Sequence, residues 1–596
     1  MEGNIILLFM ALLPFLGGLL CGTLGMKNET RGNGLAGSTA FVMFGLALGI
    51  FVSVQLTGPI SLTLPRVCGV GISFCADGFR SLYGLIAAFM WVVTAVYTPE
   101  YMAHYQKRLR FTVFSLLTLG TTLGLLYADD LLTAFMFFEL MGFTSYALLI
   151  QDEKPAALRM GQIYLAAAII SGAVMLFGLI LMYRQLGSVA YAALRRAEGT
   201  GLYLPAALIL AGYGTKAGLF PFHIWLPKAS PAAAPASALL SGILTKTRVL
   251  GILVLSSCLY MGDRAWGIAL AVLGLLTMVV GALLALFSID LKRALASSSM
   301  SQIGFIVTGI SMLCLLGDHG SLAAAGTVLH MVNHSLIKLI LFTCAGIIYM
   351  NVHSLDINRL RGYGRGKPFL KVCFLFGALS IAGVPPFSGY ISKTLLHEAI
   401  VEYAAHSGQI WATAAEWIFL LSGGITFAYM AKLFVVIFVE KAPTPQKPGI
   451  YVSGTAKTFL GFTSLLMPAM GILPDLLMVP LARLSAPFLS SDPAGMAAHF
   501  YSLESLSGAA ISISIGVLLY FFVVRRLLAE KQEDGALRYV DRLPGWMDLD
   551  EKIYRPVLQF IFTLNGKLCH WLDWLLNRPW RLIRSAVTRS KKKRKS

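Results

Sequence analysis

The clearest pattern in the sequence is a series of long apolar runs, which begins near Asn4 and ends near Val524. Many runs approach the ~20 residues that an α-helix needs to cross a bilayer. We count about fifteen runs of this kind, with centres near Leu16, Gly45, Ala87, Leu117, Leu140, Ile170, Leu210, Leu244, Leu275, Val307, Lys338, Ser380, Thr426, Leu465 and Gly516. A membrane β-barrel would instead show segments of about ten residues with alternating polarity. The pattern therefore predicts an all-α polytopic membrane protein with about fifteen spanning helices.

Two of the apolar runs are broken by proline and glycine. The first reads LAGYGTKAGLFPFHIWLPKA, with Lys216 just before Pro221, and the second reads LSIAGVPPFSGYISKTLL, with Pro385 and Pro386 before Lys393. Proline removes a helical hydrogen bond, and the freed carbonyl is tolerated in a membrane only where protein or water covers it. The breaks lie five runs apart, and units with an odd number of spans have opposite orientations. We therefore predict two inverted five-helix repeats, each with a broken helix.

The repeats divide the chain into five parts. We expect N-terminal transmembrane helices over 1–110, the first repeat over 111–256 and the inverted second repeat over 262–440. Further transmembrane helices are expected over 441–528, followed by a charged segment over 529–596. The stretch MEGNIILLFMALLPFLGGLL lacks a basic n-region and a small-residue cleavage site, so we interpret it as the first span and not as a signal peptide.

The charged final segment contains MDLDEKIYRPVLQFIFTLNGKLCHWLDWLLNRPWRLIRS, which mixes charge with tryptophan at roughly helical spacing. It is too charged to span a membrane, and we interpret it as an amphipathic helix on the cytoplasmic interface. A helix docked against a partner protein is an equally open interpretation. The tail RLIRSAVTRSKKKRKS has eight basic residues and no acidic one, which favours contact with anionic lipid.

The charge pattern indicates an orientation. Hydrophobic residues make up 57% of the chain and charged residues 13%, where soluble domains carry about 25%. The net charge of +19 is concentrated in alternate loops, with Lys107, Lys154, Lys292 and Lys441 among them, as the positive-inside rule requires. We expect the N-terminus outside and the C-terminus inside a cytoplasmic (inner) membrane. This distribution argues against a nucleic-acid partner.

The sequence offers little for a cofactor or metal. The eight cysteines form no CxxC pair and no Cys/His cluster, which argues against an iron–sulfur or structural zinc site. There is no Walker A sequence and no GxGxxG-led βαβ unit. Cys68 and Cys75 share one extracytoplasmic loop, and whether they pair is left open. That loop, LPRVCGVGISFCADG, alternates enough to predict a short hairpin.

We single out seven ionisable side chains inside the apolar runs. An ionisable residue at membrane depth costs several kcal/mol and is by default a functional candidate. In LHMVNHSLIKLILF the spacing of four residues places three of them along one helix face. The complete set is Glu139, Lys216, Lys246, His330, His334, Lys338 and Lys393.

The chemistry of this series fits a proton relay. A carboxylate beside a lysine stabilises the ammonium, and moving the carboxylate away favours release of the proton. Histidine titrates near neutrality and can pass a proton between its two nitrogens. Any one of these residues alone could be a snorkelling or hydrogen-bonded structural group, an objection that applies most to Lys338 and Lys393. Seven together favour the relay.

Two catalytic alternatives have weaker support. His330 and His334 have the spacing of a zinc-binding pair, but HMVNH lacks the glutamate of HExxH and has no obvious third ligand. No GxSxG elbow indicates a serine hydrolase.

Four separated stretches resemble one protein family. HIWLPKASPAAAPASALLSGILTKTRVLG, DDLLTAFMFFELMGFTSYALL, VLHMVNHSLIKLILFTCAGI and AGVPPFSGYISK are similar to motifs of the antiporter-like subunits of respiratory complex I, Mrp cation/proton antiporters and membrane-bound hydrogenases. The resemblance covers roughly residues 70–440. It implies two inverted five-helix repeats and conduction of protons, or in some complexes sodium, along a membrane-plane chain of charges.

The resemblance also implies a role for each position. Glu139 would couple to a neighbouring antiporter-like subunit, and Lys216 would be its partner and a switchable proton site. Lys246 would bridge to the central relay at His330 and His334.

At the far end of the relay, Lys338 would follow the histidines and Lys393 would lead to the exit. Some family members carry glutamate at the last position, and those subtypes match this chain less well. The basic tail is too short to resemble the long lateral helix of the distal complex I subunit.

We therefore expect an ion-translocating membrane subunit of a redox-driven complex, without a redox or catalytic centre of its own. Its partners would be other antiporter-like and small membrane subunits, a hydrophilic redox arm, and protons or sodium ions. The alternatives are a subunit of an Mrp-type Na+/H+ antiporter without a redox arm, and a structural subunit that does not conduct.

Overall fold

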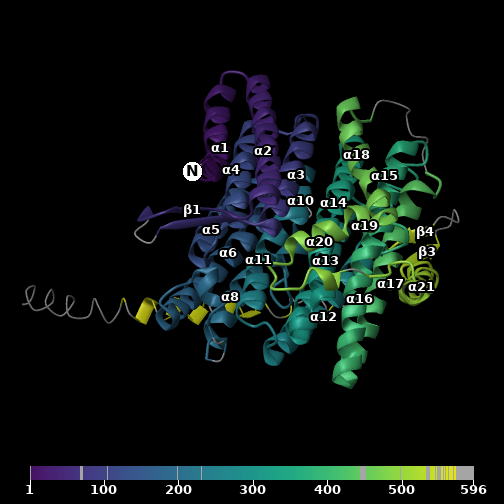
Figure 1. Cartoon of the computed structure of the whole chain (residues 1–596). Coiled ribbons are helices and arrows are strands. Elements are labelled where there is room, and N and C mark those ends of the chain that lie inside the picture. The colour runs from purple at the N-terminus through teal and green to yellow at the C-terminus, as the bar shows by residue number, and fades with distance from the viewer. Residues whose placement is uncertain are drawn as a thin grey trace, which may run out of the picture. The chain divides into compact units, whose positions relative to one another are not determined.

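The computed structural model describes most of the chain up to residue 543 and scattered positions beyond it. The described residues are 2–67, 71–103, 105–197, 199, 201–229, 231–442, 451–496, 498–531 and 537–543, with scattered residues between 545 and 573. Two compact units are present, Met1–Asp541 and Arg542–Ser596 (Figure 1).

The first unit is built almost wholly from helices. In chain order its elements are α1 (Glu2–Gly25), α2 (Glu29–Thr57), β1 (Ile60–Leu64), β2 (Ile72–Ala76), α3 (Gly78–Met102), α4 (Arg108–Tyr127), α5 (Leu131–Leu149), α6 (Pro155–Leu186), α7 (Tyr191–Leu194), α8 (Tyr203–Ala217), α9 (Trp225–Lys228), α10 (Ala234–Leu239), the π-turn η2 (Leu240–Leu244), α11 (Thr245–Cys258), α12 (Arg264–Phe287), α13 (Leu291–Leu316), η3 (Gly317–His319), α14 (Ser321–Val352), α15 (Pro368–Ala382), α16 (Ser388–Ser407), α17 (Ile410–Phe438), α18 (Gly454–Ile472), α19 (Pro474–Leu477), α20 (Val479–Ser485), η4 (Ala494–Met496), α21 (Leu503–Leu519), η5 (Tyr520–Val524), β3 (Ala529–Lys531) and β4 (Leu537–Tyr539). Helices α1, α2 and α4 contact one another at one edge of this unit (Figure 1).

Twelve helices in the described residues are long and apolar enough to cross a membrane, or thirteen if the bent pair Gly454–Ile472 and Pro474–Ser485 is one span. The prediction of a mostly helical, multi-pass membrane protein is confirmed. The predicted count of fifteen is not reached, because Leu210 and Ser380 fall in α8 and α15, which are 15 residues each. The break that ends each of these helices leaves it shorter than the ~20 residues that a helix needs to cross a membrane.

Both predicted helix breaks are present and have the same local form. Helix α8 ends at Gly218 (φ 84°) and α15 ends at Gly383 (φ 78°). Each glycine is left-handed, and its N–H bonds back to carbonyls of the last turn, as at many helix C-termini. Pro221 and Pro386 follow three residues after the respective glycine, where they prevent the helix from continuing.

A second pair of matching features lies at the starts of α5 and α13. Asp130 and Asp290 each cap the helix that follows them, with the carboxylate accepting a backbone N–H of the first turn. Each aspartate also forms an isolated antiparallel bridge with the backbone that follows the next helix, Asp130 with Ala190 and Asp290 with Asp356. Two segments far apart in sequence therefore share one pattern of helix, return helix and closing bridge.

The predicted hairpin between the second and third spans is formed by β1 and β2, which pair antiparallel from Ile60–Ala76 to Leu64–Ile72. Its first strand begins before the alternating loop that predicted it. Cys68 lies outside the described residues, so whether it pairs with Cys75 stays open.

The charged segment that starts at 529 begins with a hairpin that was not expected, which precedes the stretch predicted to be an amphipathic helix. Strands β3 and β4 pair antiparallel. The Asn358 side chain accepts from Tyr539 N at 2.8 Å and donates to Tyr539 O at 2.9 Å, so it acts as a strand partner for β4. In the second unit, the described residues from 556 to 573 are helical; the basic tail lies outside the described residues.

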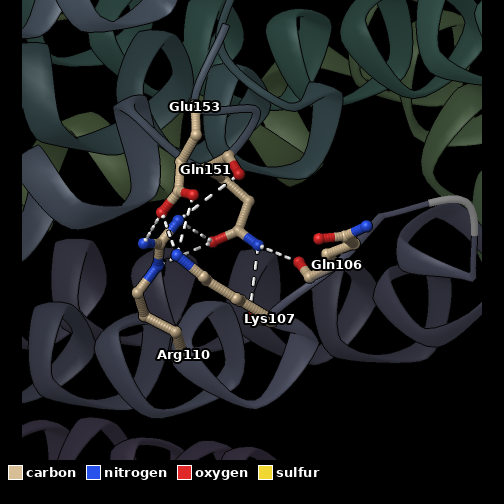
Figure 2. Close-up of polar contacts among 5 residues, drawn as sticks. All are labelled: Gln106, Lys107, Arg110, Gln151 and Glu153. Carbon is tan, nitrogen blue, oxygen red and sulfur yellow. Dashed lines mark hydrogen bonds and ion pairs between the residues drawn. The ribbon is translucent and has the colours of Figure 1, made fainter.

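An ion cluster joins the start of α4 to the turn between α5 and α6 (Figure 2). Glu153 accepts from Lys107 Nζ at 2.8 Å and from Arg110 Nη1. Beside it, Gln151 Nε2 donates to Gln106 O at 2.9 Å. The hydrogen bonds from Lys107 and Arg110 hold the pKa of Glu153 below its ordinary value of 4.5.

We expect Glu153→Gln to lower the thermal unfolding temperature slightly at neutral pH, because the charged partner of Lys107 and Arg110 is lost. The pKa of Glu153 is lowered in the folded chain, so its contribution is complete above its ordinary pKa of 4.5 and is lost as the pH falls through the lowered value. The gap between wild type and variant should therefore close in unfolding scans run from about pH 7 to about pH 3. A gap that stays constant over this range would contradict a contribution from the charge.

Candidate functional site

All seven ionisable residues predicted from the apolar runs lie in the helices of the first unit. The six basic members are buried, with exposed fractions of 8% or less. The Glu139 side chain is 21% exposed. Burial at this level means that each charge must find its partners inside the protein.

The first two members form an ion pair. Glu139 on α5 accepts from Lys216 Nζ at 2.7 Å through Oε1. Lys216 lies in the last turn of α8, directly before the break at Gly218. Its ammonium also lies 4.0 Å from the centroid of the Phe138 ring, which stabilises a cation through the ring quadrupole. The break and the pair therefore occupy one place in the fold.

Two glycines provide the space for this pair. A Cβ built on Gly172 of α6 would lie 2.5 Å from Glu139 Oε1, far inside a normal contact. A Cβ built on Gly142 of α5 would lie 3.3 Å from Lys216 Nζ. Close approach of these helix backbones is what allows the carboxylate and the ammonium to meet.

Arg248 is a buried charge that the sequence interpretation missed, although it lies two residues after Lys246 in the same apolar run. It is 0% exposed. Its Nη1 donates to Lys216 O at 2.9 Å, its Nη2 donates to Tyr164 OH at 2.7 Å, and its Cζ lies 5.2 Å from the Trp225 ring centroid. Arginine does not lose its proton in proteins. Arg248 is therefore a fixed positive charge beside the Glu139–Lys216 pair.

Lys246 and Lys338 form the next group, and backbone carbonyls accept from both. Lys246 Nζ donates to Ser241 O, in the π-turn before α11, and to Thr245 Oγ1 at 3.2 Å. Lys338 Nζ on α14 donates to Leu295 O at 2.7 Å. The sequence spacing places Lys246 and Arg248 on different faces of α11, and the structure directs Arg248 toward α8.

His330 is held by hydrogen bonds at both ring nitrogens. Its Nδ1 is 3.0 Å from Ser392 Oγ and its Nε2 is 3.0 Å from Gln302 Oε1. A neutral imidazole donates through one nitrogen and accepts through the other. His330 therefore joins Gln302 of α13 to Ser392 of α16 with one donated and one accepted hydrogen bond. Among the described residues no group of three His, Cys, Asp or Glu side chains is placed to hold a metal ion.

His334 lies one turn further along the same face of α14. Its ring centroid is 6.4 Å from that of His330, and the rings are nearly parallel at 11°. Both ring nitrogens are buried without a hydrogen-bond partner within the described part of the chain. Buried polar side chains are usually hydrogen-bonded, so His334 differs in this respect from His330.

Lys393 ends the series, just beyond the second break. Its Nζ donates to Ile381 O at 2.8 Å, in the last turn of α15, and lies 4.7 Å from the Phe305 ring centroid. A small cavity of about 30 Å³, the scale of one water molecule, is lined by Lys393, His397 and Ser505 among others.

Two further buried lysines fall outside this series. Lys432 on α17 donates to Leu286 O and to Ser288 O, at the end of α12. Lys292, which the charge pattern assigns to a loop, is instead buried in the first turn of α13 and donates to Ala232 O at 2.7 Å. Lys432 binds carbonyls at the end of α12 and Lys292 binds a loop carbonyl before α10, so each has a structural role.

This site lies in the part of the chain that matches a known family. The family described as NADH:quinone oxidoreductase/Mrp antiporter, TM matches residues 128–432. A probable K(+)/H(+) antiporter protein of Rhizobium meliloti (strain 1021) is 28% identical over 587 residues, which are 94% of this chain and 56% of that protein. The hydrogenase-4 component B of Escherichia coli (strain K12) is 28% identical over 378 residues, which are 61% of this chain and 56% of that protein. The chain thus spans just over half the length of each.

A solved structure shares the fold. A chain of the Mrp complex from Dietzia sp. DQ12-45-1b superposes with a TM-score of 0.74 at 21% identity, over 83% of this chain and 100% of that chain. At this identity the likeness shows the fold alone.

We expect Gly172→Ala to destabilise the fold by about 1–3 kcal/mol, because the added methyl overlaps the Glu139 carboxylate. Thermal unfolding in detergent measures this cost. The matched control is Gly49→Ala on α2, where a Cβ meets nothing within 4 Å.

The cost of Gly172→Ala should fall sharply in a Glu139→Ala background, since the clash is then removed. An equal cost in both backgrounds would show that the carboxylate does not occupy the space beside Gly172.

Proposed function

The chain belongs to the NADH:quinone oxidoreductase/Mrp antiporter, TM family, and on that premise we propose that it is an ion-translocating subunit that moves protons along its buried side chains. The observation that carries this proposal is the Glu139–Lys216 ion pair at the break of α8. It is followed by buried bases on α11, α14 and α16. A series of this length in the membrane has a high energetic cost, which a purely structural role does not require.

The pair supplies the switch. While Glu139 lies 2.7 Å from Lys216, the carboxylate stabilises the ammonium. If Glu139 moves or is neutralised, Lys216 is left desolvated beside the fixed charge of Arg248 and releases its proton toward Lys246.

The rest of the series carries the proton to the other end. Lys246, Lys338 and the two histidines, His330 and His334, form the central relay, and Lys393 leads to the exit. The two ends, Glu139–Lys216 and Lys393, are protonated alternately. Protons are the proposed substrate because the carboxylate already has a lysine at hydrogen-bond distance, whereas a sodium site needs several free oxygen ligands. Sodium is the alternative substrate.

The matching breaks and bridges support two inverted repeats, over 111–256 and 262–440. Asp130 and Asp290 play the same role in each and are separated by five spanning segments. An odd number of spans places the two aspartates on opposite sides of the membrane. The parts over 1–110 and 441–528 then act as flanking transmembrane helices.

The positive-inside pattern supports a cytoplasmic membrane location, with the N-terminus outside and the C-terminus inside. The segment over 529–596 then lies on the cytoplasmic side. The helical residues described between 556 and 573 support a surface helix there, and the basic tail would contact anionic lipid.

The chain is proposed to work in a multisubunit complex driven by redox chemistry in a hydrophilic arm, together with other antiporter-like and small membrane subunits. The match to a hydrogenase component supports this assignment. The second candidate is a subunit of an Mrp-type antiporter without a redox arm. The antiporter relative supports it, because its match extends over 94% of this chain.

We expect Lys216→Ala to reduce ion translocation at least about tenfold, because the switchable proton site is removed. The measurement follows internal pH and sodium together in sealed proteoliposomes that contain the purified complex. Glu139→Gln should act in the same direction while the complex still assembles. Lys154→Ala is the matched control, since that lysine side chain is 64% exposed. If internal pH and sodium change as in the wild type when the assembled complex carries Lys216→Ala, the chain has a structural role and does not conduct ions.

A further inference from the structure

Helix α13 carries a polar stripe, in the stretch ALASSSMSQ, that the seven-residue series does not include. Ser298, Ser299 and Gln302 are each 0% exposed. Gln302 already holds His330, as described above. The two serines lie one turn earlier, between α11 and α14, where Lys246 and Lys338 project.

Ser299 is joined to the π-turn before α11. Its hydroxyl forms a hydrogen bond with the hydroxyl of Ser241, and either oxygen can be the donor. Ser299 Oγ also donates to Leu295 O at 3.0 Å. A hydroxyl has a single proton, so Ser299 either donates to Leu295 O and accepts from Ser241, or turns and donates to Ser241. The pair therefore has two polarities of similar geometry.

Each serine of this pair is linked to a carbonyl oxygen that accepts a hydrogen bond from one of the two lysines. On the α11 side, Lys246 Nζ donates to the carbonyl of Ser241. On the α14 side, Lys338 Nζ donates to Leu295 O at 2.7 Å, the same oxygen that accepts from Ser299. Lys338 Nζ also donates to Ser298 Oγ. The hydroxyl pair thus lies between the two carbonyl oxygens, Ser241 O and Leu295 O, that accept from the two lysines.

The π-turn places the carbonyl and the hydroxyl of Ser241 toward different partners. A π-turn adds one residue to a helix and is frequent at functional sites. Here Ser241 O accepts from Thr245 Oγ1 at 3.0 Å as well as from Lys246 Nζ. The same residue directs its carbonyl to Lys246 and its hydroxyl across to Ser299.

We propose that the Ser241–Ser299 hydroxyl pair is the proton bridge between Lys246 and Lys338. This rests on the proposed function, and it names the groups that join two of its stations. In one transfer the Lys246 ammonium turns from the carbonyl of Ser241 to the hydroxyl of the same residue and gives it a proton, and the hydroxyl proton of Ser241 passes to Ser299 Oγ. The Ser299 hydroxyl turns away from Leu295 O, the oxygen that it shares with Lys338 Nζ, and passes its proton to Lys338 Nζ. Each oxygen gains one O–H bond and loses another, so Lys246 becomes the neutral amine, Lys338 becomes the ammonium, and no further reactant is needed.

The electrostatics of the site favour such a transfer. Two ammonium groups in one low-dielectric region repel each other, so a proton on one lysine disfavours a proton on the other. A bridge that can reverse its polarity lets the proton move while both helices stay in place.

The experiment compares Ser299→Ala, Ser299→Thr and Ser241→Ala in the purified complex in sealed proteoliposomes. Proton flux is measured in H2O and in D2O. Ser299→Ala and Ser241→Ala should each reduce flux at least about tenfold and raise the solvent isotope effect, because the broken bridge becomes rate-limiting. Ser299→Thr keeps the hydroxyl and should retain most of the flux. The double alanine variant should be no slower than either single variant, because one bridge is lost in all three.

Ser311→Ala is the matched control, because Ser311 is a fully buried serine of the same helix whose hydroxyl bonds only to Thr308 O, at 2.6 Å, among the described residues. Wild-type flux in Ser299→Ala would overturn the bridge, as would a loss in Ser299→Thr equal to that in Ser299→Ala. If Lys216→Ala abolishes flux while Ser299→Ala does not, only the bridge is rejected. If neither variant alters flux, the proposed function fails with it.

Discussion

Burying positive charge inside a lipid-spanning bundle is the constraint on which the rest of this structure depends. The series of buried ionisable residues contains one carboxylate, Glu139, which pairs with Lys216. Five further basic residues of the series follow Lys216 in the sequence, and the series has no second carboxylate for them. The cations are instead stabilised mainly by backbone carbonyls. Lys393 uses the last turn of α15, Lys246 the π-turn before α11, and Arg248 the last turn of α8. Inside a regular helix each carbonyl is already bonded along the helix, so these acceptors lie at helix ends or in the π-turn. Lys338 is the exception, because Leu295 O lies inside α13.

The helix breaks and the buried charges therefore stabilise each other. A broken helix leaves carbonyls unpaired at membrane depth, and a buried ammonium needs acceptors there. Each feature removes the cost of the other. At the first break Arg248 donates to the carbonyl of Lys216, and at the second break Lys393 donates to the carbonyl of Ile381. The two breaks also share their form, with Gly218 and Gly383 in the left-handed region.

Much of this arrangement could be predicted from the sequence, because the membrane restricts what a segment can be. Apolar runs located the helices, proline and glycine located the breaks, and rare charges marked the positions at which Glu139 and Lys216 meet. The count of spans was less predictable, since α8 and α15 are halves of broken segments. The hairpin of β3 and β4 was not predicted, because Asn358 bonds to Tyr539 of β4, and a contact 181 residues away leaves no local signal.

The partners of the charges could not be predicted in the same way. Spacing along a helix says which residues share a face, but not which element lies opposite. Ser299 and Gln302 look like ordinary polar residues until α13 is placed against α14 and the π-turn. Arg248 was within reach of sequence reasoning, since a second cation stands beside Lys246 in one apolar run. Its link to Lys216 O depends on the packing of α11 against α8.

The most direct test of the account compares two buried lysines that differ only in whether they belong to the proposed relay. Lys246 and Lys432 are 0% and 1% exposed, and both donate to backbone carbonyls. Proton flux would be measured in sealed proteoliposomes with the assembled Lys246→Met and Lys432→Met complexes, after equal assembly is shown. The account predicts a loss of at least about tenfold for Lys246→Met and nearly wild-type flux for Lys432→Met. Equal flux in the two variants would contradict it, because position in the relay would then have no effect on conduction.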